Sequence, residues 1–180
     1  MAKSDNMPLP VNDTLVHQLF EEQVFESPNA TAVVFEDEIL TYAELNARAN
    51  QLAYTLITFG VTADEPVAVA LERSPSAVIA LLAIFKAGGV YVPFDPDYPA
   101  DRLRFMLEDS GARILLTTEA LRERLPLKAE HTICLDTNQG SIAANPHSNP
   151  NLSIAPDHLA YYSEIKVLID KVSLFILKNS

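Results

Sequence analysis

The stretch KAGGVYVPFDPDYPADR, residues 86–102, decides the fold because it holds four structural signals in a row. Gly88 and Gly89 follow a long apolar segment, where glycine commonly supplies the left-handed residue that ends a helix. The letters VYVPF then predict a buried strand, and the two prolines of DPDYP predict a stiff turn. Pro99, with Asp101 shortly after it, marks the start of another helix. The stretch therefore predicts a helix, a strand and a second helix, which is the repeating unit of an α/β domain.

Helices and strands continue to alternate on both sides of this stretch. Upstream, PVAVALE predicts a strand, and SPSAVIALLAIFK predicts a helix with Pro75 near its first position. That helix is apolar nearly all round, so the rest of the fold must cover it. Downstream, we expect a helix in PADRLRFMLEDSG, a strand in ARILLTT, a helix in EALRERL and a strand in HTICLD. This order predicts an α/β domain with a mostly parallel sheet flanked by helices.

Residues 13–60 predict two amphipathic helices separated by a hairpin. The first helix lies in DTLVHQLFEEQVFESP, with Asp13 as its expected N-cap, and ATAVVFEDEILTY predicts a hairpin whose acidic turn is residues 36–38. Thr41 and Glu44 form a capping box that begins the second helix, and a glycine ends it. The apolar stripes are Leu15, Val16, Leu19, Phe20 and Val24 in the first helix, and Leu45, Ala49, Leu52, Leu56 and Phe59 before Gly60 in the second.

The polar residues of the opening stretch do not predict a binding site. A dinucleotide fingerprint needs glycines after a strand and before a helix, and here the glycine pair stands in the reverse order. Lys86 is not a P-loop lysine, because no G-x-x-x-x-G precedes it. Asp95, Asp97 and Asp101 lack the glycine and the final glutamate of an EF-hand calcium loop, and two prolines stiffen the segment. Asp101 is better explained as a favourable charge at a helix N-terminus.

The composition limits the setting and the partners of the chain. A formal net charge of −11 at pH 7 opposes nucleic acid and anionic membrane surfaces. Cys134 stands alone, the four histidines lack a zinc-site spacing, and the first ten residues lack the apolar core of a secretory signal. We expect a cytoplasmic chain without a nucleic-acid or membrane partner. Without a comparison to other proteins, the residues predict an α/β scaffold and no catalytic, cofactor-binding or metal-ligating residue.

Two segments together resemble one protein family. LTYAELNARANQLAYTL, residues 40–56, resembles the first core motif of the amino-acid adenylation domains of nonribosomal peptide synthetases. FKAGGVYVPFDPDYPADRLRFMLEDSGARILLT, residues 85–117, resembles their second, and the likeness covers about residues 12–161. The pair of motifs is highly specific. The resemblance implies a scaffold role for Leu40, Thr41, Tyr42, Glu44, Leu45, Lys86, Ala87, Gly88, Tyr91, Pro93, Asp95 and Pro99.

The resemblance implies the fold and chemistry of the adenylate-forming enzymes, which include acyl-CoA synthetases and luciferases. Such enzymes use ATP and magnesium to turn a carboxylate into an acyl-adenylate and pyrophosphate, and then load the acyl group on the phosphopantetheine thiol of a carrier protein. In the family, a Ser/Thr/Gly-rich loop that cradles the phosphates follows an LAY strand. This chain reaches DHLAYY at residues 157–162 and continues as SEIKVLIDK, without such a loop or its following lysine. We therefore expect no catalytic residue, no bound cofactor and no adenylation activity from this chain alone.

These expectations divide the chain into three parts. They are a flexible N-terminus over residues 1–12, an incomplete N-terminal subdomain of the adenylate-forming fold over residues 13–162, and a divergent tail over residues 163–180. Residues 138–156, rich in Asn, Ser, Ala and Pro, predict a loop or linker. The tail predicts an amphipathic helix that is too short and too charged to span a membrane. Two interpretations of the tail stay open, a truncated or frame-shifted gene product and a genuine short protein whose tail covers the unfinished fold.

Two functional hypotheses follow from the resemblance. The first is the N-terminal part of an amino-acid-adenylating domain, inactive unless another chain completes it. The second is a non-catalytic interaction module that binds a synthetase module, a carrier protein or the missing half of a split enzyme, since an unfinished sheet exposes an edge and apolar faces. A fragment of an acyl-CoA synthetase is a third hypothesis, but YVPFDPDYPADRL favours the peptide-synthetase branch.

Overall fold

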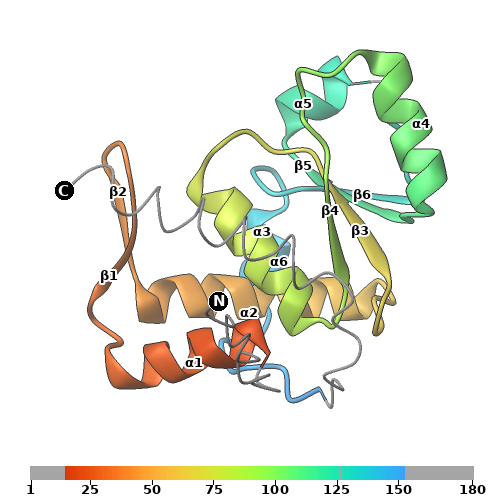
Figure 1. The fold of residues 1–180 in the computed structure, drawn as a ribbon. Coiled ribbons are helices and arrows are strands. Elements are labelled where there is room, and N and C mark those ends of the chain that lie inside the picture. Colours follow the sequence, from red (N-terminus) through yellow and green to blue (C-terminus); the bar gives the residue numbers. More distant parts are fainter. Residues whose placement is uncertain (1–14, 126, 153–180) are drawn as a thin grey trace, which may run out of the picture.

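The computed structural model describes residues 15–125 and 127–152. Figure 1 shows a parallel sheet flanked by helices and a separate two-stranded hairpin, which confirms the predicted α/β class. The expected N-terminus over residues 1–12 and the tail over residues 163–180 lie outside the described residues. The elements are α1 (Val16–Glu26), β1 (Thr31–Phe35), β2 (Glu38–Thr41), α2 (Tyr42–Thr58), β3 (Pro66–Val69), α3 (Pro75–Lys86), β4 (Val90–Pro93), α4 (Ala100–Ser110), β5 (Ile114–Thr117), α5 (Glu119–Arg124), β6 (His131–Cys134) and α6 (Gln139–Ala143).

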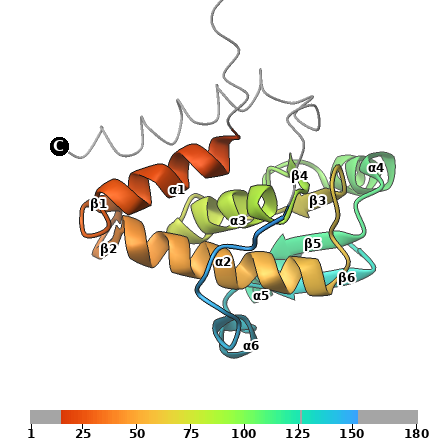
Figure 2. The ribbon, with the colours of Figure 1, turned by 90° about the horizontal axis from the view of Figure 1, so that it is seen from below.

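The four-stranded sheet has the order β4-β3-β5-β6, and all three neighbouring pairs are parallel. The chain runs from β3 through α3 to β4 at one edge, and then through α4 to β5 on the other side of β3. Because the direction of the crossovers reverses after β4, helix α3 lies on one face of the sheet and helix α4 on the other. Helices α2 and α3 cover one face, and α4 and α5 cover the other (Figures 1 and 2).

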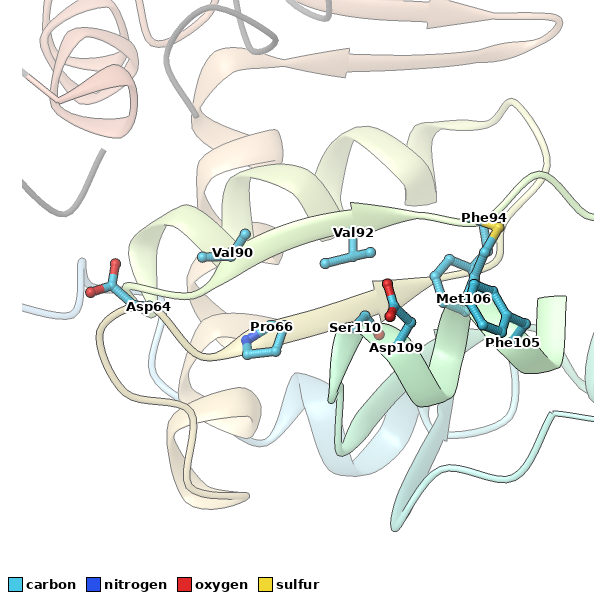
Figure 3. Close-up of a pocket in the computed structure, with 9 residues that line it drawn as sticks. All are labelled: Asp64, Pro66, Val90, Val92, Phe94, Phe105, Met106, Asp109 and Ser110. Carbon is cyan, nitrogen blue, oxygen red and sulfur yellow. The ribbon is translucent and has the colours of Figure 1, made fainter. Parts of the chain in front are cut away.

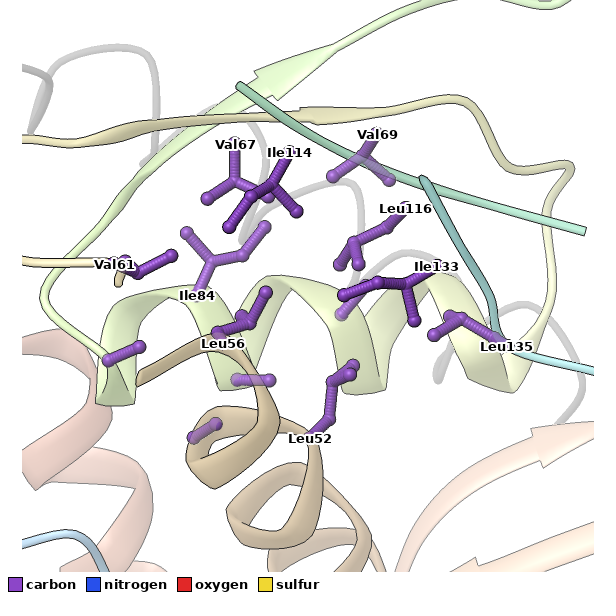
Figure 4. Packing of buried hydrophobic residues seen from close by; sticks show 14 residues of the cluster. Leu52, Leu56, Val61, Val67, Val69, Ile84, Ile114, Leu116, Ile133 and Leu135 are labelled. Atoms are coloured by element: carbon purple, nitrogen blue, oxygen red, sulfur yellow. The ribbon is translucent and has the colours of Figure 1, made fainter. Parts of the chain in front are cut away.

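Alternating side chains of the strands divide the core into two layers. Val67 and Val69 of β3 face α2 and α3, whereas Ala68 between them faces α4. Figure 4 shows the first layer, in which Leu52 and Leu56 of α2 approach the sheet. All residues of α3 from 80 to 86 are buried, which confirms the expectation that the fold covers this helix. Each large apolar side chain buried in this way contributes about 1.5–3 kcal/mol.

The glycines after α2 and α3 end these helices as predicted. Gly60 and Gly88 have φ values of 89° and 81°, the left-handed region that glycine adopts at the lowest cost. Gly89 is required for another reason, because a Cβ at this position would lie 3.0 Å from Val61 Cγ1 and 3.1 Å from the carbonyl oxygen of Glu65. The turn from α3 to β4 therefore depends on both glycines of the pair.

The hairpin and the capping box are confirmed. Strands β1 and β2 are antiparallel, and Glu36 adopts a φ of 51° in the turn between them. Thr41 precedes α2, where its hydroxyl accepts a hydrogen bond from the N–H of Glu44, while the Glu44 carboxylate accepts one from the N–H of Thr41. Four consecutive residues thus set the start of the longest described helix, as the sequence predicted.

The first residue of α1 and the extent of its buried apolar face differ from the prediction. The N-cap is Leu15 rather than Asp13, and the Leu15 N–H donates to Gln18 Oε1 at 3.1 Å. Leu19, expected in the buried stripe, is 43% exposed. Helix α1 packs on the body through Val16 and Phe20, so its contact face is narrower than the apolar stripe of the sequence.

Two further predictions, one for β4 and one for residues 138–156, are wrong. β4 was expected to be buried, but it is an edge strand in which Val92 is only half-buried and Pro93 is exposed. Residues 138–156 were expected to be a loop, yet they include α6, which forms because Ile142 packs against the first core layer. In both cases a contact between distant segments, which local composition does not encode, decides the outcome.

Candidate functional site

An apolar hollow of about 600 Å³ lies beside the open edge of the sheet, between β4 and α4 (Figure 3). Val90 and Val92 of β4 line it on one side, and Phe105 and Met106 of α4 on the other. Phe105 is 66% exposed, an unusual position for so large an apolar side chain. Within the described residues β4 is an edge strand, and a hollow beside such an edge is suited to docking another apolar segment.

The polar groups around this hollow do not form a catalytic arrangement. Asp64 and Asp109 supply carboxylates at its rim. The Ser110 hydroxyl donates to the Leu107 carbonyl at 3.0 Å and accepts from the N–H of Ala112 at 3.3 Å, so it serves the end of α4. Within the described residues, the hydrogen bonds of Ser110 thus go to backbone groups and not to a histidine or carboxylate that could activate it as a nucleophile.

A second polar feature is buried among the N-terminal helices, and we call it the Lys86 cluster. It consists of Lys86 from α3, Glu21 from α1, Asn46 and Asn50 from α2, and Asn149. The Lys86 side chain is fully buried and forms an ion pair with Glu21, whose side chain is 24% exposed. Lys86 Nζ also donates to Asn149 Oδ1 at 3.4 Å. An ammonium group that is buried in this way is stable only because its partners replace the lost water.

Burial sets the protonation of the groups in and near this cluster. Desolvation lowers the pKa of Lys86, and the hydrogen bond and charge of Glu21 oppose this change. Desolvation also lowers the pKa of His17, with a raising contribution from Glu21 and a smaller lowering one from Lys86. Tyr91 of β4, half-buried against Leu81 and Phe85 of α3, has its pKa raised to about 12 by burial. Both shifts favour the neutral form of the side chain.

Cys134 and the aspartates of residues 86–102 have structural roles. Burial raises the pKa of the Cys134 thiol, which keeps it in the unreactive protonated form. Asp95 Oδ1 accepts a hydrogen bond from the N–H of Asp97 at 3.0 Å, and Asp101 forms an ion pair with Arg104 within the first turns of α4. Across residues 15–125 and 127–152, no three His, Cys, Asp or Glu side chains are grouped so that they could hold a metal ion.

The two sequence motifs meet at the Lys86 cluster, where Asn46 and Asn50 of the first and Lys86 of the second donate to Asn149 Oδ1. In the first motif, Leu40 and Leu45 pack together with Leu82 of α3, while Thr41 and Glu44 cap α2. Tyr42 packs at the edge of the same group, and its ring lies 5.9 Å from that of Phe20. The motif thus joins the hairpin, α2 and α3, and none of its side chains lines the hollow of Figure 3.

The second motif runs from the Lys86 cluster to the start of α4. Ala87 is fully buried in the first core layer, and the Gly88 carbonyl accepts a hydrogen bond from the N–H of Asp64 at 3.1 Å. Pro93 ends the edge strand β4, and Pro99 is the N-cap of α4. These positions are compatible with a scaffold role, which stays a prediction for all twelve motif residues.

The partners of Lys86 were not predicted from the sequence. Glu21 and Asn149 lie 65 and 63 positions away, so no local pattern links them to Lys86. A weak signal was present in α2, where Asn46 and Asn50 stand one helical turn apart among apolar residues. Polar side chains on a face that must be buried imply a buried hydrogen-bond partner.

The sequence of this chain is similar to sequences of known proteins. Residues 20–163 match the family described as AMP-binding enzyme, and the chain belongs to that family. One linear gramicidin synthase protein of Brevibacillus parabrevis is 48% identical over 146 residues, which are 81% of this chain and 2% of that protein. Another linear gramicidin synthase protein of the same organism is 50% identical over 157 residues, covering 87% of this chain and 3% of that protein. The chain thus spans only a small part of the length of these relatives, and its relation to the adenylation domains of nonribosomal peptide synthetases is confirmed.

A solved structure shows the same fold. The nonribosomal peptide synthetase FmoA3, crystallised in an alpha-methyl-L-serine-AMP bound form, superposes with a TM-score of 0.77 at 33% identity. The match covers 83% of this chain and 17% of that chain. The match confirms the predicted fold, which is that of the N-terminal subdomain of adenylate-forming enzymes. Among the residues that the structure describes, no helix is long and apolar enough to cross a membrane.

The described residues do not fit ATP and magnesium, which the fold family implies. A triphosphate needs backbone donors and cations, and magnesium needs free carboxylate oxygens. The hollow beside β4 instead presents the Asp109 carboxylate, whose charge would repel a triphosphate, and the described residues hold no group of three His, Cys, Asp or Glu side chains that could bind a metal ion. The buried ammonium of Lys86 is already neutralised by Glu21.

Proposed function

We propose that this chain forms the N-terminal part of an amino-acid-adenylating ligase domain that takes part in secondary metabolite biosynthesis in the cytoplasm. The observation that carries the proposal is the 48% identity to a linear gramicidin synthase protein over 146 residues. In a complete domain, ATP and magnesium would convert an amino acid into an aminoacyl-adenylate and pyrophosphate, and a carrier protein would accept the acyl group. The residues of this chain would supply the scaffold around that site.

For the 180-residue polypeptide itself, we propose no adenylation activity. The sequence after DHLAYY offers no Ser/Thr/Gly run followed by a lysine, and the described polar groups are used to hold helices together. Losing even one donor to a developing negative charge costs about 10²- to 10³-fold in rate. A chain without the whole loop should therefore be inactive.

Amino-acid-dependent exchange of pyrophosphate into ATP tests the proposed inactivity of the 180-residue chain. The purified 180-residue chain should give no exchange above a no-enzyme background with any of the proteinogenic amino acids. The matching adenylation domain of the linear gramicidin synthase protein that is 48% identical serves as the positive control. Clear exchange by the 180-residue chain would overturn the proposal of inactivity.

The hollow beside β4 favours a second candidate function, an interaction module for a synthetase module, a carrier protein or the missing part of a split domain. Its support is the exposed Phe105 together with the position of β4 at the edge of the sheet that the structure describes. Mixing the chain with the part of the gramicidin synthase domain that follows the matched region separates the two functions. Restored exchange supports a split enzyme, whereas binding without exchange supports the interaction module.

A matched pair of variants tests whether the hollow is the binding surface. Phe105→Asp should weaken that binding at least tenfold, because it places a charge in the apolar hollow. Phe25→Asp changes another exposed phenylalanine, 89% exposed on α1, and should leave binding unchanged. Equal effects of the two substitutions would exclude the hollow as the docking surface.

A further inference from the structure

The segment after α6 lies across the outer side of α2, as Figure 2 shows, and side chains of α2 hold it there. Gln51 Nε2 donates to the carbonyl of Ala143 at 2.7 Å, and Asn145 Nδ2 donates to the carbonyl of Gln51 at 3.1 Å. Asn50 Nδ2 donates to the carbonyl of His147 at 2.6 Å. The segment between residues 144 and 152 has no regular secondary structure, so these long-range bonds determine its path.

Asn149 is the point at which this segment meets the Lys86 cluster. Its Oδ1 accepts from Asn46 Nδ2 at 3.0 Å, from Asn50 Nδ2 at 2.9 Å and from Lys86 Nζ at 3.4 Å. Lys86 in turn is paired with Glu21. One amide oxygen thus connects the segment to α2 and α3 directly and to α1 through the ion pair.

Without this oxygen each of the three donors would lose one acceptor, although Lys86 keeps Glu21 and Asn50 Nδ2 keeps the His147 carbonyl. Lys86 and Asn50 are 1% and 0% exposed, so water cannot replace a lost acceptor. The Oδ1 atoms of Asn46 and Asn50 are buried and accept no hydrogen bond from the described part of the chain. The side-chain amides of Asn46 and Asn50 are therefore oriented by the hydrogen bonds that their Nδ2 groups donate to Asn149, because their Oδ1 atoms accept none within the described residues.

From this geometry we propose that Asn149 is a positioning residue, which, with Lys86 and Glu21, fixes residues 143–152 on the helices; in the sequence this segment continues to DHLAYY. The proposal rests on the proposed function, because in an adenylating domain that continuation leads to the phosphate-binding loop. Lys86, a residue of the second motif, then acts by holding Asn149 in place and contacts no phosphate itself.

Limited proteolysis of the full 180-residue chain by a protease of broad specificity, with mass-spectrometric mapping of cleavage sites, tests the proposal. Asn149→Ala should raise cleavage within residues 143–152 at least tenfold, because local opening exposes the backbone of this segment. Asn149→Asp should stay within about threefold of the unsubstituted chain, since all three hydrogen bonds to Asn149 are accepted by Oδ1, which aspartate retains. Asn151→Ala, an exposed asparagine in the same segment, is the matched control and should change nothing.

Cleavage of Asn149→Ala within twofold of the unsubstituted chain would overturn the proposal, as would equal cleavage of the alanine and aspartate variants. If circular dichroism shows that the alanine variant does not fold, the aspartate variant decides: unchanged cleavage supports positioning by the Oδ1 acceptor, and increased cleavage contradicts it. The assay needs neither ATP nor a partner. Its failure is therefore separate from failure of the proposed function, which the exchange assay measures.

Discussion

The Thr41–Glu44 capping box and the Lys86 ion pair are stabilised over very different distances along the sequence. Thr41 and Glu44 of the first motif bind each other within one helical turn. Lys86 of the second motif binds Glu21, 65 positions before it, and Asn149, 63 positions after it. The capping box is thus a local signal that starts a helix, whereas the Lys86 cluster joins separate segments and includes Asn46 and Asn50 of the first motif. The difference predicts that substitutions at the Lys86 ion pair cost more and spread further than substitutions at the capping box.

The largest effect is expected at the ion pair of Lys86. Glu21→Gln leaves the buried ammonium without its anion and should reduce the free energy of unfolding by about 3 kcal/mol. Lys86→Met removes the charge together with its desolvation cost and should cost less than about 1.5 kcal/mol. Urea denaturation of both variants measures the difference.

Glu22→Gln is the matched control on the same helix, since Glu22 is exposed, and it should stay within about 0.5 kcal/mol of the unsubstituted chain. A Lys86→Met variant that is less stable than Glu21→Gln would contradict the argument. In that case the ion pair itself, rather than the cost of an unpaired buried charge, would stabilise the three-helix contact.

A smaller effect is expected at the glycine pair, where the second motif turns into β4. Gly89→Ala brings a Cβ to 3.0 Å from Val61 and 3.1 Å from the Glu65 carbonyl, so backbone must shift. We expect a loss of about 2 kcal/mol in the free energy of unfolding, measured by urea denaturation. Gly140→Ala in α6 has open space around the new methyl group and should be neutral or slightly stabilising. Equal effects at the two glycines would show that crowding does not matter at Gly89.

Local and long-range signals also explain how much of the fold could be predicted. The start of α2 was predicted correctly because the Thr41–Glu44 capping box is complete in four residues. The half-buried state of Val92 could not be predicted, since it depends on β4 lying at the sheet edge, and strand order is not written in the local pattern. The Lys86 cluster was missed for the same reason, because Asn149 comes near only when α6 places the following segment across α2.

The first motif should show a more modest effect. Thr41→Ala removes the acceptor for the N–H of Glu44 and should cost about 1 kcal/mol in the free energy of unfolding. The backbone N–H of Thr41 and, to a smaller extent, its hydroxyl lower the pKa of the Glu44 carboxyl; alanine keeps the N–H and loses the hydroxyl, so this pKa should rise part of the way toward its ordinary value. Denaturation and a carboxyl titration by NMR measure the two effects. Thr41→Ser keeps the hydroxyl and should preserve both quantities; a serine variant as unstable as alanine would count against the capping role.

The smallest expected effect concerns the pH dependence that His17 adds near the Lys86 cluster. Desolvation lowers the pKa of His17 below its ordinary value of 6.5, Glu21 opposes this, and Lys86 reinforces it. The unfolded chain therefore binds a proton at this residue before the folded chain does, so stability present above pH 6.5 is lost as the pH falls toward the folded pKa. Between pH 7 and pH 5, a His17→Gln variant should lose less stability than the unsubstituted chain in urea denaturation. Lys86→Met should raise the pKa of His17 and reduce the same loss, because it removes a neighbouring positive charge. A folded-state pKa of His17 at or above 6.5 in an NMR titration would contradict this argument, and would indicate that Glu21 interacts with His17 more strongly than burial opposes its charge.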